Sequence, residues 1–273
     1  MCAQSPPEIA QTICDVGCKK TKLAIGKMFV LAMLAGAYIG FGAQLSTAVK
    51  VGLADVVGTG FANLVGGAVF SVGLMLVVIG GAELFTGNNL ISLACCHGKA
   101  AWTGLLKNWV VVYIGNFVGS IVLALIVFGG FYASMSATEP TALATLALNT
   151  ANAKVNLSFA EAFFRGIACN WLVCLAVWLA ASSKDTIGKI FGVFFPIMAF
   201  VAMGFEHSIA NMYFIPMGIF IQDIAGVTGA GANLNWAGFL GNNLLPVTIG
   251  NIVGGVFFVA VLYWYAYLQG KKE

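Results

Sequence analysis

His207 and the adjacent Glu206 form the pair in this sequence that is best suited to proton or anion chemistry. An imidazole gains and loses its proton near neutral pH, so His207 could present a positive charge to an anion or hand that anion a proton. The surrounding residues are mainly apolar, which indicates a membrane segment. A histidine at membrane depth is a functional candidate, and a hydrogen-bonded structural histidine is the alternative.

The residues around this pair occur twice in the chain. The spacing G-x-E-x4-N is found at Gly81, Glu83 and Asn88, and again at Gly204, Glu206 and Asn211. A second spacing, N-x6-G-N-x2-G, follows each copy, at Asn108, Gly115, Asn116 and Gly119 and at Asn243, Gly250, Asn251 and Gly254. Two matches in the same order predict an internal duplication, with repeat one at about residues 28–132 and repeat two at about 159–268.

The duplication also predicts a partner for His207 and roles for the acidic residues. Thr86 lies at the corresponding place in the first half, one position past the match to His207, and its hydroxyl could hydrogen-bond His207 or the substrate. Glu83 and Glu206 would repel an anion if they faced its pathway. We therefore expect these carboxylates to accept backbone N–H groups that an interrupted helix leaves free, and the amides of Asn88 and Asn211 to satisfy the same loops.

Two further features favour an anion. Helices that restart near Asn88 and Asn211 would turn their positive dipole ends toward the centre of the membrane. Lys154, predicted on an outer loop before the fourth apolar segment, could concentrate anions at a vestibule, with a solvated loop lysine as the alternative.

The elements that position these residues must be membrane helices. The chain is 60% hydrophobic and 8% charged, with a mean hydropathy of +0.94, whereas about a quarter of the residues in a soluble domain are charged. Six segments are long and apolar enough to span a bilayer: residues 28–49, 56–83, 109–132, 159–182, 190–222 and 245–268. The repeated motif interrupts the second and the fifth, which predicts broken helices that line a cavity.

The basic residues indicate how this all-α membrane protein is oriented. Ten of the 13 lysines and arginines fall on the side of the N-terminus and three on the other, so both termini are predicted to be cytoplasmic. Three spans per repeat is an odd number, which predicts that the two repeats have inverted topology. Residues 1–27 then form a cytoplasmic lead-in, 28–268 the channel domain, and 269–273 a cytoplasmic tail.

No part of the sequence predicts a metal, a cofactor or a nucleic-acid partner. Six of the seven cysteines lie in an apolar run or beside lysine-bearing segments predicted to be cytoplasmic, where thiols stay reduced. A membrane-embedded enzyme that uses Glu206 and His207 as an acid–base pair is a distant alternative, since it would lack a second titratable cluster. A water or glycerol pore is another, but the Asn-Pro-Ala signature of aquaporins is absent.

Several stretches resemble the formate/nitrite transporter family. They are residues 81–88 (GAELFTGN), 107–109 (KNW), 115–119 (GNFVG), 170–178 (NWLVCLAVW), 204–212 (GFEHSIANM) and 246–251 (PVTIGN). The resemblance covers nearly the whole chain from Lys22 to Leu268, and the stretch at 204–212 is highly specific.

This resemblance implies an aquaporin-like protomer of six spans in the inner membrane, assembled as a homopentamer with one pore per subunit. It implies the following positions: Phe70 and Leu74 at a cytoplasmic constriction, Phe200 in the other hydrophobic slit, His207 and Thr86 as the central pair, Lys154 as the outer anion attractor, and Asn170 as a polar pore contact. The interruption of the second segment would form a mobile loop that gates the inner mouth.

The resemblance also implies transport of a small monovalent anion across the bilayer. Residues 81–87 (GAELFTG) are closer to nitrite and hydrosulfide channels, whereas residues 213–218 (YFIPMG) and 245–251 (LPVTIGN) are closer to formate channels. We expect formate as the substrate, with nitrite second and hydrosulfide third. Coupling to protons through His207 stays open.

Overall fold

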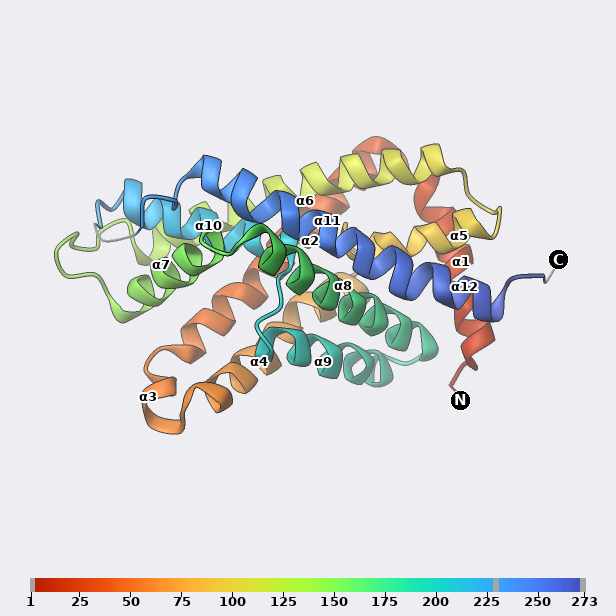
Figure 1. Ribbon diagram of the computed structural model, residues 1–273, viewed down its shortest axis with the longest axis horizontal. Helices are drawn as coiled ribbons and strands as arrows, with labels where there is room; N and C mark the ends of the chain where they lie inside the picture. The colour runs from red at the N-terminus through yellow and green to blue at the C-terminus, as the bar shows by residue number, and fades with distance from the viewer. Residues whose placement is uncertain (1–2, 228–230, 271–273) are drawn as a thin grey trace.

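The computed structural model describes residues 3–227 and 231–270, which form helices joined by short connections (Figure 1). In chain order these are α1 (Pro6–Thr21), α2 (Ile25–Lys50), α3 (Leu53–Val57), α4 (Thr59–Gly80), η1 (Gly87–Leu90), α5 (Ile91–Cys96), α6 (Trp102–Phe131), α7 (Ala142–Val155), α8 (Phe159–Ser182), α9 (Thr186–Ala202), α10 (Ser208–Asp223), η2 (Gly238–Leu244), α11 (Leu245–Gly255), η3 (Val256–Val261) and α12 (Leu262–Tyr267). The last four run on as one helix, Gly238–Tyr267.

Among the described residues, five helices are long and apolar enough to cross a bilayer: α2, α4, α6, α8 and the continuous helix Gly238–Tyr267. The fifth predicted segment is divided between the shorter α9 and α10, which residues 203–207 connect. The second predicted segment ends at Gly80, and helical structure resumes at Gly87. Both predicted interruptions are therefore confirmed.

A glycine in the left-handed region ends the helix at each interruption. Gly81 has φ +79° and Gly204 has φ +72°, a conformation that costs a residue with a Cβ about 1–2 kcal/mol. A glycine at this place terminates a helix and lets the chain change direction. The first residue of the repeated motif thus sets where α4 and α9 stop.

Glycines on α6 and α11 allow each helix to lie close to its neighbour. A Cβ at Gly119 would overlap the backbone carbonyl of Met33 on α2, and a Cβ at Gly254 would overlap that of Ile167 on α8. Such close backbone approach is typical of packed membrane helices. The same contact is therefore made once in each half of the chain.

Two helices extend the repeat beyond its predicted bounds. The lead-in contains α1, which packs on α5, and the region predicted as an outer loop contains α7, which packs on α10. The loop prediction was wrong because the apolar face of α7 is buried against α10, and burial of that face stabilises a helix whose sequence alone is only weakly amphipathic. Figure 1 shows α1 and α12 at one end of the bundle and α3 and α7 at the opposite end.

Candidate functional site

The two interruptions bring Thr86 and His207 into direct contact. Thr86 Oγ1 lies 2.9 Å from His207 Nε2, and both side chains are buried. Thr86 is the last residue of the first interruption, immediately before η1, and His207 is the last residue of the second, immediately before α10. The partner that the duplication predicted for His207 is thus in hydrogen-bonding position.

The other ring nitrogen of His207 has a structural role that defines its tautomer. His207 caps α10, because its Nδ1 accepts the backbone N–H of Ala210 at 3.0 Å. A ring nitrogen that accepts a hydrogen bond carries no proton, so in the neutral imidazole the proton is on Nε2. Nε2 therefore donates to Thr86 Oγ1, which leaves the threonine hydroxyl free to donate to a substrate.

Glu206 lies at the centre of a buried polar cluster. Its Oε1 is 2.7 Å from Nζ of Lys154, and its Oε2 accepts from the amide of Asn211 at 2.7 Å and from that of Asn243 at 3.2 Å. The ammonium group balances the carboxylate, which a buried charge requires. The cluster is neutral as a whole.

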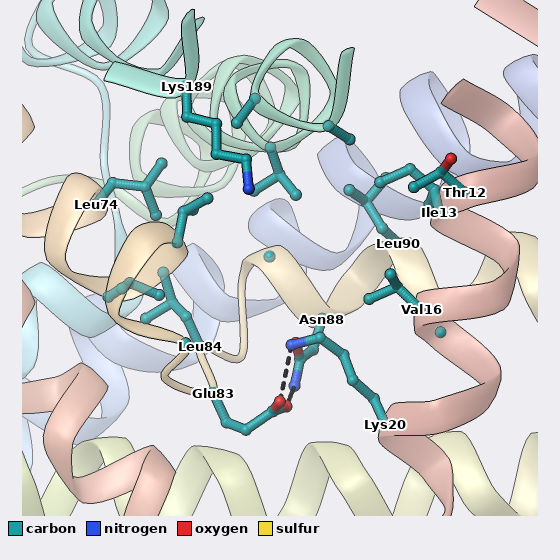
Figure 2. A pocket seen from close by; sticks show the side chains of 18 of the residues that line it. Thr12, Ile13, Val16, Lys20, Leu74, Glu83, Leu84, Asn88, Leu90 and Lys189 are labelled. Carbon is teal, nitrogen blue, oxygen red and sulfur yellow. Dashed lines mark hydrogen bonds and ion pairs between the residues drawn. The ribbon is translucent and has the colours of Figure 1, made fainter. Parts of the chain in front are cut away.

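Glu83 has an equivalent cluster in the first half. Its Oε1 is 2.9 Å from Nζ of Lys20 on α1, and its Oε2 accepts from the amide of Asn88 at 2.6 Å. Asn88 also donates to Asn108 at 2.9 Å, as Asn211 does to Asn243 at 2.7 Å. Figure 2 shows Lys20 and Asn88 converging on Glu83. Lys20 is thus the counterpart of Lys154.

The prediction that Glu83, Glu206, Asn88 and Asn211 satisfy the unwound backbone through their side chains was wrong. Within the described part of the chain, the side-chain hydrogen bonds of these residues go to one another and to neighbouring lysines and asparagines. Burial costs less free energy for a carboxylate paired with an ammonium group than for a carboxylate that is hydrogen-bonded to neutral groups alone.

The unwound backbone is instead held by the asparagines of the second motif. Asn116 Oδ1 accepts from the N–H of Phe85, and its amide donates to the carbonyls of Ala32 and Glu83 at 2.8 and 2.9 Å. Asn251 makes the matching bonds with Ser208, Gly166 and Glu206, at 2.9, 2.8 and 2.9 Å in that order. The duplication marked both residues but did not indicate this role.

One cavity, of about 180 Å³, reaches His207 from the side of α7. We name it the His207 cavity; its walls include Phe70, Phe200, His207, Lys154 and Lys50. Phe70 meets Phe200 edge to face with ring centroids 5.8 Å apart, and Phe200 stacks near His207 at 5.9 Å. Phe70 therefore packs with Phe200 beside the histidine. Its place with Leu74 at a cytoplasmic constriction, which the resemblance implied, stays a prediction.

A larger cavity, of about 580 Å³, lies on the side of α1. We name it the Glu83 cavity; its walls include Leu74, Glu83, Asn88, Lys20 and Lys189 (Figure 2). The two cavities share no lining residue. Leu74 and Phe70 lie on neighbouring turns of α4 and face different cavities, so the closed section of the molecule lies between them.

Asn170 lies behind Thr86 and away from both cavity walls. Its amide donates to the carbonyl of Thr86 at 3.2 Å and to that of Asn251 at 2.7 Å, and its side chain is fully buried. The implied pore contact is thus replaced by a contact that holds the backbone of the residue facing His207.

Lys154 is on α7 and not on a loop, and its side chain is only 15% exposed. The sequence places Lys20 among the lysines predicted to be cytoplasmic, because nothing near it in the sequence resembles the surroundings of Lys154. The feature that Lys20 and Lys154 share is their position on a short helix before the first span of the repeat: Lys20 is on α1 before α2, and Lys154 is on α7 before α8.

The geometry is that of a pathway with a polar centre. Two cavities approach a buried Thr86–His207 pair from opposite ends, and a neutral lysine–glutamate cluster stands at each helix break. Within residues 3–227 and 231–270, no group of three or more histidine, cysteine or acidic side chains is placed to hold a metal ion.

Comparison with known proteins agrees with this arrangement. The family model described as formate/nitrite transporter matches residues 7–265. A relative from Methanothermobacter thermautotrophicus, named "Probable formate transporter", is 49% identical over 97% of this chain and 98% of its own length. "Formate channel FocA" of Escherichia coli K12 is 40% identical over 97% of this chain and 94% of its own.

A solved structure has the same fold. "Pentameric formate channel with formate bound" matches with a TM-score of 0.80 and 41% identity, covering 90% of this chain and 98% of that one. The predictions of an all-helical membrane protein and of a transport protein are confirmed, and so is the resemblance noted from the motifs. This chain is a multi-pass membrane protein that belongs to the formate/nitrite transporter family.

Proposed function

We propose that this chain conducts formate across the membrane through the Thr86–His207 centre. The observation that carries the proposal is the hydrogen bond between these two buried side chains, placed between cavities that open from opposite ends. The names of the relatives and of the solved structure point to the same substrate class.

The centre offers a small anion one strong hydrogen-bond donor. Because Nε2 of His207 donates to Thr86 Oγ1, the threonine hydroxyl can donate to a formate oxygen. The Phe70 and Phe200 rings exclude water beside it. Burying an anion without its hydration shell is costly. A narrow centre of this kind therefore favours ions that are small enough to enter, lose most of their hydration water and accept a hydrogen bond from the Thr86 hydroxyl.

Proton coupling through His207 would require a local rearrangement. To become imidazolium, the ring must accept a proton at Nδ1, which at present accepts the N–H of Ala210. The cap of α10 is then lost. A protonated His207 could give the proton to formate, which would leave as the neutral acid while the ring returns to its capping state.

The remaining predictions are part of this proposal. Six crossings in inverted repeats, cytoplasmic termini and an inner-membrane location are supported by the lysine distribution and by the matching contacts of the two halves. The proposal that the chain forms a homopentamer is supported by its similarity to the solved channel, which is described as pentameric. On this orientation the Glu83 cavity is the cytoplasmic vestibule and the His207 cavity the outer one.

The test is flux of formate into proteoliposomes that contain the purified protein. We expect saturable flux, competed by nitrite and hydrosulfide more strongly than by the larger acetate. Changing His207 to Phe should abolish pH-dependent flux while the protein still inserts. Vesicles that stay closed to every small monovalent anion would refute the proposal, and swelling in glycerol would support a neutral-solute pore instead.

A further inference from the structure

Among the described residues, three of the lysines that line the cavities have no acidic partner within 4 Å: Lys50, Lys184 and Lys189. Two of them, Lys50 and Lys189, are half-buried. Lys50, in the last turn of α2, lines the His207 cavity, and Lys189, in the first turn of α9, lines the Glu83 cavity. No carboxylate oxygen among the described residues lies within 4 Å of either ammonium group. Both side chains are half-buried, so each charge is presented to the water of its cavity.

Lys50 reaches its cavity by crossing Gly66 of α4. A Cβ built on Gly66 would lie 2.7 Å from Cδ of Lys50 and 3.0 Å from Oγ of Ser46. Any larger residue at Gly66 would therefore displace the aliphatic part of Lys50. The absence of a side chain at Gly66 opens the route by which the ammonium group reaches the vestibule.

Lys189 occupies the place in the second repeat that Gly66 occupies in the first. Gly66 and Lys189 each lie 15 residues before the glycine that ends the helix, Gly81 and Gly204 respectively. Figure 2 shows Lys189 extending from α9 into the Glu83 cavity, apart from the Lys20–Glu83 pair. Each cavity thus contains one half-buried cation without an acidic partner among the described residues. In one half this lysine comes from α2 and crosses Gly66 of α4, and in the other it belongs to α9 itself.

The nearest acidic residue in the sequence does not cancel the charge of Lys189. Asp185, four residues earlier, accepts the N–H of Gly188 at 2.8 Å and the hydroxyl of Ser183 at 2.9 Å. Its carboxylate is held at the cap of α9 by these bonds. Lys184 also lines the Glu83 cavity, but it is exposed, so solvent screens its charge more strongly.

The unpaired lysines differ in this respect from Lys20 and Lys154. Those two lie 2.9 and 2.7 Å from glutamates, and each such pair has no net charge. An anion in a vestibule is attracted mainly by charge that no neighbour balances, and a cavity with apolar walls strengthens that attraction. We propose that Lys50 and Lys189 are the capture sites for carboxylate anions at the outer and inner mouths, an inference that rests on the proposed formate transport.

This assignment predicts side-specific kinetics. Each capture site should lower the formate concentration that half-saturates entry from its own side and leave the maximal flux unchanged, because neither lysine touches the Thr86–His207 centre. A unit charge a few ångströms from the anion in an aqueous cavity is worth about a three- to tenfold change in half-saturation.

The experiment measures formate entry in both directions with right-side-out and everted vesicles. Lys50→Gln should raise half-saturation about threefold or more for entry from outside only, and Lys189→Gln should do so for entry from inside only. Lys184→Gln should have a smaller inside effect. The charge-preserving Lys50→Arg should restore native values, and high concentrations of an impermeant salt should remove the differences. Gly66→Ala should act like Lys50→Gln.

Matched controls lie outside the cavities. Arg165, paired with Glu161, and Lys107, which is exposed, line neither cavity, so their glutamine variants should transport like the native protein. Equal effects of Lys50→Gln in both directions, or lower maximal flux with unchanged half-saturation, would overturn the capture role. If the native protein moves no formate, the transport proposal itself fails. If the native protein moves formate but the lysine variants have native half-saturation, only the capture role fails.

Discussion

Replacing Lys154 by methionine removes one partner of a buried ion pair and keeps an unbranched apolar side chain that is one atom shorter. Glu206 would then keep two asparagine donors but lose its balancing charge. Breaking a buried pair in this way costs about 3–5 kcal/mol of unfolding free energy. Because the two side chains are only 15% and 5% exposed, solvent can compensate little.

The double variant Lys154→Met/Glu206→Gln separates charge from packing. The glutamine that replaces Glu206 keeps a carbonyl oxygen for the amides of Asn211 and Asn243 and has no charge to balance. Most of the loss should therefore be recovered. The matched pair of substitutions in the first half is Lys20→Met and Glu83→Gln. For Lys20→Met alone we expect a smaller loss of unfolding free energy, about 2 kcal/mol, since Lys20 is 25% exposed.

The assay is reversible unfolding in mixed micelles, followed by tryptophan fluorescence, with flux measured on the same samples. A coupling energy of about 2 kcal/mol or more between positions 154 and 206 is expected. If the double variant is as unstable as Lys154→Met alone, the loss comes from packing and not from an unbalanced carboxylate, and the reasoning is refuted.

Three further predictions concern the centre and the repeated glycines. Thr86→Val should lower formate flux at least tenfold and Thr86→Ser should restore it, because only the hydroxyl is needed; flux through the valine variant at the native rate would exclude this donor. Gly254→Ala should destabilise the protein by about 2 kcal/mol or more by driving a methyl group into the carbonyl of Ile167, whereas Gly241→Ala, which meets nothing within 4 Å, should unfold like the native protein. Gly204→Ala should cost about 1–2 kcal/mol because of its positive φ, measured by the same unfolding assay; a cost equal to that of Gly241→Ala would show that the turn relaxes.

Much of the site could be predicted because the two halves repeat the same local problem. Each half must stop a helix in an apolar medium, so Gly81 and Gly204 recur with an acid and an amide at fixed spacing. That repeat indicated that Thr86 could hydrogen-bond His207 or the substrate, and the family resemblance implied that the two residues form the central pair. What the spacing could not indicate is which polar groups pair, since Glu206 has Lys154, Asn211 and Asn243 within reach only after three separate helices have packed.

The sequence by itself determined the medium and the two helix breaks, because hydropathy, glycine and short-range spacing act locally along the chain. The pairing of Thr86 with His207 was indicated by the repeat and by the family resemblance, and the tertiary structure brings the two side chains together. Only the tertiary structure decided that Lys20 serves Glu83 as Lys154 serves Glu206, and that Lys50 and Lys189 have no acidic partner among the described residues. The physical reason is that a lysine's partner depends on where a helix distant in sequence is packed. That position depends on the packing of α1 on α5 and of α7 on α10, which no local pattern records.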